Sequence, residues 1–132
     1  MDERAHSQPA FAGFLGIKIT HVSPERVTAE LQARDELNNR FGILHGGAIM
    51  ALADNLGGTA TTANLKPGQS TATIESKTNF FAAVPIGDVA YAECTPLHRS
   101  RTTMVWQTRI TRADGRLCAI VTQTQMVLDK KT

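Results

Sequence analysis

At residues 39–47 the chain reads Asn39-Arg40-Phe41-Gly42-Ile43-Leu44-His45-Gly46-Gly47, and an apolar run with one carboxylate, Asp54, follows directly. Ala, Leu, Ile and Met dominate that run, which predicts a long helix over about residues 46–65. The helix would open on His-Gly-Gly with no Ser, Thr, Asp or Asn directly ahead of it, so we expect its first N–H groups to lack a side-chain cap. Those donors would then be free for a ligand oxygen at the positive end of the helix dipole.

Asp54 would supply the second half of a hydrolytic site, because acyl transfer needs an oxyanion donor and a base or nucleophile. Gly46 and Asp54 are eight residues apart, which is roughly 12 Å along one helix. One carbonyl group cannot contact both, since each contact must be about 3 Å long. If both serve one reaction, two copies of the helix must run antiparallel across a dimer, and each dimer then holds two sites.

Strand patterns dominate the rest of the chain. We expect a short helix at 9–15 and strands at 16–22, 27–34, 71–81, 89–95, 98–111 and 117–128. One long helix after two strands, followed by four more strands, indicates an α+β fold rather than a βαβ series. Gly57-Gly58 inside the long helix costs about 1 kcal/mol per glycine relative to alanine, which suggests that a ligand or another backbone passes close there.

Composition indicates one globular domain over residues 1–132. The chain is 42% hydrophobic and 20% charged, and its net charge of +2 is too small to indicate nucleic-acid binding. No apolar run approaches the roughly 18 residues of a membrane span, and the N-terminus is not typical of a signal peptide, so the cytoplasm is the expected location. Cys94 and Cys118 lack the spacing of a redox or zinc pair and are expected to be reduced core thiols.

The pattern Asn39, His45-Gly46-Gly47 and Asp54, followed by long strands, resembles the hotdog-fold acyl-CoA thioesterases of the phenylacetate-pathway and hydroxybenzoyl-CoA group. The likeness extends from Phe14 to Leu128. It implies one long central helix wrapped by an antiparallel sheet of about five to six strands. It also implies an acyl-CoA substrate, a homodimer as the minimal active unit, a tetramer as the full assembly, and no metal or bound cofactor, because coenzyme A is part of the substrate.

The resemblance implies a role for each polar group of the motif. Asp54 would act as general base or nucleophile, and the Gly46 N–H would polarise the thioester carbonyl. Gly47 would allow close backbone approach, although both glycines could merely fit a tight junction. His45 would donate to the leaving sulfur or the carbonyl, unless it is a structural histidine. Asn39 would orient water or the acyl carbonyl, unless it only shapes the loop.

One hydroxyl group of the hydroxybenzoyl-type pattern is missing. That pattern has Ser or Thr one turn after the carboxylate, where this chain has Gly58. The resemblance to the phenylacetate-like branch implies that Thr73 on the following strand supplies the hydroxyl, with Thr59 as a weaker substitute.

Substrate contacts are expected in two places. An acyl pocket at the dimer seam would be built from Phe41, Leu44 and Met50, which favours a small aryl or short- to medium-chain acyl group. By the same resemblance, basic side chains would reach the coenzyme A phosphates from His98, Arg99 and Arg101, unless this stretch is plain polar surface. The histidines of the chain are too scattered to indicate a metal site.

Two other functions are compatible with such a fold. A regulatory module that binds acyl-CoA without turnover would not need Asp54. A hydratase or dehydratase would need an acid–base pair, commonly Asp and His a few residues apart, and no His follows Asp54 in the helix. Release of free thiol from acyl-CoA substrates separates these functions from hydrolysis.

Overall fold

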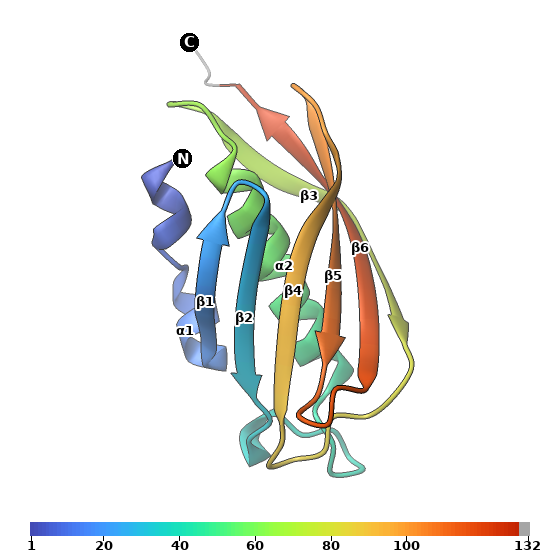
Figure 1. Ribbon diagram of the computed structural model, residues 1–132. Helices are drawn as coiled ribbons and strands as arrows, with labels where there is room; N and C mark the ends of the chain where they lie inside the picture. The colour runs from blue at the N-terminus through green and yellow to red at the C-terminus, as the bar shows by residue number, and fades with distance from the viewer. Residues whose placement is uncertain (130–132) are drawn as a thin grey trace.

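The computed structural model describes residues 1–129 as a curved sheet with one long helix against it (Figure 1). Its elements are η1 (Glu3–His6), α1 (Ala10–Leu15), β1 (Ile17–Ser23), β2 (Arg26–Gln32), η2 (Asp35–Leu37), α2 (Gly46–Ala63), β3 (Ser70–Phe80), β4 (Val89–Arg99), β5 (Thr103–Thr111) and β6 (Leu117–Leu128). The six strands form one antiparallel sheet in the order β1-β2-β4-β5-β6-β3. The predicted α+β architecture of one long helix and an antiparallel sheet is therefore confirmed.

Helix α2 is held in place by an apolar side that faces the sheet. Ile49, Leu52 and Leu56 recur at intervals of three or four residues and are buried. On β5, Trp106 is fully buried, and its Nε1–H donates to Thr61 Oγ1 at 2.9 Å. The helix is thus both packed and hydrogen-bonded against the sheet, which determines the direction of every side chain on it.

A bulge in the edge strand β3 decides which of its side chains face α2. The pairing with β6 slips between Thr73 and Glu75, which makes Ile74 the extra residue. Because strand side chains alternate between the two faces, an extra residue changes which later positions point inward. Thr73 before the bulge and Ser76 after it both contribute side chains on the helix side, whereas Ile74 is exposed.

The boundary between β4 and β5 differs from the sequence prediction. β4 continues through Arg99 and β5 begins at Thr103, whereas a single strand was expected over residues 98–111. A tight turn separates the two strands, in which the Ser100 N–H donates to Thr103 O at 2.9 Å and the Thr103 N–H donates to Ser100 Oγ at 3.1 Å. This turn contains no Gly or Pro, and Ser100 is the weaker turn residue that the sequence offers here.

Both cysteines are free and buried, as predicted. Burial raises the pKa of the Cys94 thiol to about 12, and burial also raises the pKa of Cys118. Both groups are therefore neutral thiols near pH 7. Among the described residues, no helix is both long and apolar enough to cross a membrane.

Gly57 and Gly58 have different surroundings. A Cβ on Gly57 would overlap Oε1 of Gln123, which comes from β6, so no larger residue fits while Gln123 keeps its position. At Gly58 no other group lies within 4 Å of where a Cβ would be. At Gly57 the close approach is made by a side chain of the sheet rather than by a backbone. Gly58 lines a cavity next to the helix, and the approach of a ligand there stays a prediction.

We expect Gly57→Ala to lower the free energy of unfolding by about 1 to 2 kcal/mol, because the new methyl group must displace the buried amide of Gln123 from its hydrogen bonds. Gly58→Ala is the matched control, and it should be neutral or stabilising by up to about 1 kcal/mol because of its higher helix propensity. Urea unfolding of both variants measures the difference. A Gly57→Ala protein as stable as the wild type would contradict the packing described above.

Candidate active site

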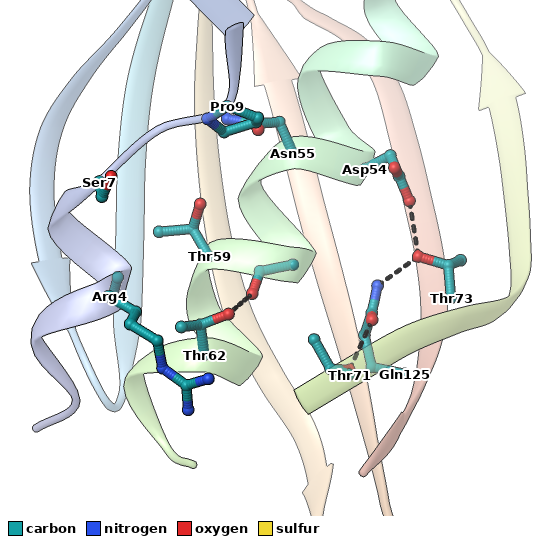
Figure 2. A pocket seen from close by; sticks show the side chains of 12 residues that line it. Arg4, Ser7, Pro9, Asp54, Asn55, Thr59, Thr62, Thr71, Thr73 and Gln125 are labelled. Carbon is teal, nitrogen blue, oxygen red and sulfur yellow. Dashed lines mark hydrogen bonds between the residues drawn. The ribbon is translucent and has the colours of Figure 1, made fainter. Parts of the chain in front are cut away.

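Asp54 lies on the exposed side of α2, where donors from two strands hold its carboxylate. Oδ1 accepts a hydrogen bond from Thr73 Oγ1 at 2.8 Å (Figure 2) and one from Gln123 Nε2 at 2.8 Å. The same Gln123 nitrogen lies 3.3 Å from the backbone oxygen of Asp54. Within residues 1–129, Oδ2 accepts no hydrogen bond. One carboxylate oxygen is fixed, and the other is free to act on a ligand.

Thr73 is itself held by a buried amide. Gln125 Nε2 donates to Thr73 Oγ1 at 2.6 Å, and Gln125 Oε1 accepts from Thr71 Oγ1 at 2.9 Å. Figure 2 shows these groups in a row that ends at Asp54. The candidate Thr59 instead lies within hydrogen-bond distance of Gln8. Of the two hydroxyl groups considered from the sequence, Thr73 is the one that contacts the carboxylate.

His45 caps the N-terminus of α2. Its Nδ1 accepts from the Gly47 N–H at 2.8 Å, so the expectation of a helix without a side-chain cap is wrong. The imidazole reaches a donor two residues ahead, as the shorter side chain of Asp or Asn does in a usual cap. Because Nδ1 accepts, the neutral ring carries its proton on Nε2, which leaves an N–H donor on an exposed side chain.

Gly46 retains a donor for a ligand. No acceptor for its N–H is found in the described part of the chain. Gly46 lines a cavity of about 380 Å³ together with Asn39, Leu44, Phe80 and Phe81. A Cβ on Gly46 would lie 3.2 Å from Phe80 Cζ, so a side chain here would press on the aromatic ring.

Asn39 shapes the loop before α2. Its Oδ1 accepts from the backbone N–H of Phe41 at 2.8 Å and from that of Ile43 at 3.3 Å. The loop-shaping alternative therefore accounts for the side-chain oxygen. Asn39 also lines the cavity of Gly46, and a contact between its amide nitrogen and the substrate stays a prediction.

Asp54 and Gly46 lie in separate cavities of the single chain. The cavity at Asp54 has a volume of about 270 Å³ and lies between the N-terminal segment, α2 and β3 (Figure 2). Gly58, Thr59, Thr62 and Thr71 line it, and none of the residues around Gly46 do. This separation agrees with the eight residues of α2 that stand between the two groups.

The remaining predicted contact residues are dispersed in the single chain. Leu44 lines the cavity of Gly46, but Phe41 is 80% exposed on its loop and Met50 is 40% exposed on α2. At the far end of the sheet, Arg99 Nη1 donates to Pro24 O at 3.0 Å. Substrate contacts by these residues stay predictions.

His98 and Arg101 are exposed near the turn between β4 and β5, close to Arg99 in the chain. The structure thus keeps the three basic residues together at one end of the sheet, and their contact with coenzyme A stays a prediction. No group of three His, Cys, Asp or Glu residues in the range 1–129 is arranged to hold a metal ion.

Gln123 and Gln125 were not among the residues predicted from the sequence. Both are 1% exposed, on the side of β6 that also carries buried Ala119 and Val121. A glutamine at two successive inward positions of a strand is the signal that could have found them, because buried amides need partners.

Comparison with known proteins assigns the family. The family model described as "Thioesterase superfamily" matches residues 41–119. The 1,4-dihydroxy-2-naphthoyl-CoA hydrolase of Escherichia coli (strain K12) is 31% identical over 116 residues, which are 88% of this chain and 85% of that relative. The proofreading thioesterase EntH of Cronobacter turicensis is 34% identical over 104 residues, which are 79% of this chain and 75% of that relative.

Solved structures agree with this assignment. The crystal structure of a mutant thioesterase from Pseudomonas aeruginosa matches with a TM-score of 0.84 and 28% identity, covering 89% of this chain and 85% of that one. The helix, the sheet and the strand order described above are therefore those of a hotdog fold, and the chain belongs to the thioesterase superfamily.

Proposed function

We propose that this chain is an acyl-CoA thioesterase that hydrolyses a small aryl or short- to medium-chain acyl-CoA to the free acid and coenzyme A. The observation that carries the proposal is the environment of the Asp54 carboxylate. Two donors fix its Oδ1, while Oδ2 accepts no hydrogen bond within residues 1–129. A fixed carboxylate with one available oxygen suits a general base or a nucleophile. Membership of the thioesterase superfamily supports the reaction class.

The proposed chemistry needs three further groups. The Gly46 N–H polarises the thioester carbonyl at the positive end of α2. Asp54 activates water, or it attacks the carbonyl carbon itself and forms a mixed anhydride that water then hydrolyses. In both routes the C–S bond breaks, coenzyme A leaves as the thiol, and one water is consumed in releasing the free acid. His45 Nε2–H donates to the carbonyl oxygen or the leaving sulfur, and Asn39 orients the water or the carbonyl.

A homodimer would complete the site. Strand β3 forms one edge of the sheet, and Ile74 and Phe80 on it are 57% and 51% exposed. An open, partly apolar edge strand is suited to pairing with another copy. Pairing of two β3 edges about a two-fold axis would set the α2 helices side by side and antiparallel, which supports a site shared between Gly46 of one subunit and Asp54 of the other. Such dimers would assemble further into tetramers.

The cavity at Asp54 favours a compact acyl group. Its volume of about 270 Å³ is just below the range of roughly 300 to 1,000 Å³ that ligand sites usually have. Its threonine-rich lining offers hydrogen-bond partners to a hydroxylated aryl group. The E. coli relative is named for 1,4-dihydroxy-2-naphthoyl-CoA, which makes that compound a reasonable member of a substrate panel.

We expect thiol release from benzoyl-, phenylacetyl-, hexanoyl- or 1,4-dihydroxy-2-naphthoyl-CoA, and slower release from lauroyl-CoA because its acyl chain exceeds the cavity. A thiol-reactive dye measures the initial rates. Tight binding of all five compounds without thiol release would instead favour an acyl-CoA-binding module. Hydration of crotonyl-CoA without thiol release would favour a hydratase.

Asp54→Asn should reduce kcat by about 100-fold or more, the scale expected when a general base or nucleophile is lost. KM should change little, because the amide keeps the shape of the side chain. Initial rates of Asp54→Asn and of the wild type, measured at several concentrations of the best substrate of the panel, give both constants. A variant that keeps half of the wild-type kcat would remove Asp54 from the mechanism.

Two inactive variants with lesions in opposite halves of the shared site should complement each other. Gly46→Pro removes the N–H donor, and its hybrids with Asp54→Asn subunits would contain one site with both lesions and one with neither. We expect up to about half of the wild-type activity per verified hybrid dimer, with circular dichroism as the control for folding of Gly46→Pro. Hybrids as inactive as their parents would show that the site is not shared in this way.

A further inference from the structure

The hydrogen bonds that lead to Asp54 all donate toward it, from Gln125 to Thr73 and from Thr73 to the carboxylate. The amide nitrogen of Gln125 can donate but cannot accept, so the Thr73 hydroxyl must accept this bond, which is 2.6 Å long. The one hydrogen of that hydroxyl is then left for Asp54 Oδ1 at 2.8 Å. Gln125 Oε1 faces the Thr71 hydroxyl, which lies 2.9 Å from this oxygen and also 2.9 Å from the backbone oxygen of Met126.

Gln123 approaches the same carboxylate oxygen from the next strand. Its Nε2 lies 2.8 Å from Asp54 Oδ1 and 3.3 Å from the backbone oxygen of Asp54. The two hydrogens of this nitrogen can serve both acceptors, so Gln123 binds the side chain and the backbone of Asp54 together. Gly57 leaves the space for this amide, since any Cβ there would overlap Gln123 Oε1.

We propose that Gln123 and Gln125 are positioning residues for Asp54: Gln123 binds Oδ1 directly, Gln125 directs the Thr73 hydroxyl to Oδ1, and Oδ2 is thereby the oxygen presented to the substrate. Both amides are 1% exposed. Gln123 does not line the cavity at Asp54, whereas the side chain of Gln125 forms part of its wall. The consequence for turnover rests on the proposed thioesterase function. The hydrogen-bond arrangement itself can be tested without turnover.

Met replaces Gln in the test variants because it keeps the length of the side chain and removes its donor. Gln123→Met and Gln125→Met should each lower kcat by about 3- to 30-fold with KM within about twofold. Gln123→Met removes a hydrogen bond to the carboxylate itself, and Gln125→Met removes the bond that directs the Thr73 hydroxyl to it. Gln107→Met is the matched control. Gln107 is half-buried on β5, where its neighbours in sequence, Trp106 and Thr108, point to the core, so it lies on the opposite face of the sheet.

A double-variant cycle tests the route through Thr73. Gln125→Met should cause no further loss of kcat in a Thr73→Val background, because the proposed effect of Gln125 on Asp54 passes through that hydroxyl. Multiplied losses in the double variant would overturn the proposed role of Gln125. A folded Gln123→Met protein with wild-type kcat would overturn the role of Gln123.

Thermal unfolding shows which variants are folded. If Gln125→Met does not fold, Gln125→Glu takes its place, because a carboxylate of the same shape accepts from Thr73 and turns the hydroxyl hydrogen away from Asp54. We then expect a loss of kcat at least as large as that predicted for Gln125→Met. Wild-type kcat in folded Gln125→Glu would overturn the proposal.

Side-chain amide signals in NMR spectra report the network independently of activity. In Asp54→Ala the Nε2 hydrogens of Gln123 should shift and exchange faster with solvent, and in Thr73→Val those of Gln125 should do so, while the signals of Gln107 stay unchanged. If the wild type hydrolyses thioesters but these signals do not respond, the positioning proposal fails and the proposed function stands. If the signals respond but no thiol is released from any substrate of the panel, the proposed function fails and the network stands.

Discussion

The packing of α2 against the sheet is the interaction on which the rest of the structure depends. Leu52 and Leu56 on the helix and Trp106 on β5 are fully buried, and the bond from Trp106 to Thr61 adds a directional contact to the apolar one. Because one side of the helix is fixed in this way, its other sides are fixed as well. Asp54 is consequently carried to the boundary between α2 and β3, where it meets polar groups of the sheet instead of bulk water alone.

A carboxylate at that boundary requires hydrogen-bond donors, and the sheet supplies them at the expense of apolar packing. Gln123 and Gln125 occupy inward positions of β6 that could otherwise hold aliphatic residues. Buried amides are costly unless they are hydrogen-bonded. Here each amide nitrogen has an acceptor, whereas Gln123 Oε1 has no partner among the described residues. Gly57 completes the arrangement, because only a residue without a Cβ leaves room for the amide of Gln123. The glycine that weakens the helix therefore serves the carboxylate one turn before it.

The rigidity of α2 also links the proposed activity to assembly. Gly46 begins the helix and Asp54 lies about two turns further along it. A helix that is packed over its whole length cannot bend to bring these two groups together. For this reason Gly46 and Asp54 line two separate cavities in one chain. A second copy of the helix is the simplest way to place an N-terminal donor beside a mid-helix carboxylate.

The α+β class and the order of the long helix and the strands could be predicted from the sequence, because hydrophobic periodicity is a local property. Gly46 and Asp54 became candidates through the spacing of the motif, and Thr73 through the family resemblance alone. The cap made by His45 was missed, since the usual capping residues do not include histidine. The two glutamines could not be assigned to Asp54 from the sequence. Gln123 and Asp54 are 69 positions apart, and Gln125 and Thr73 are 52 positions apart. These contacts depend on strand register and on the bulge at Ile74, which only the tertiary packing of α2 against the sheet decides.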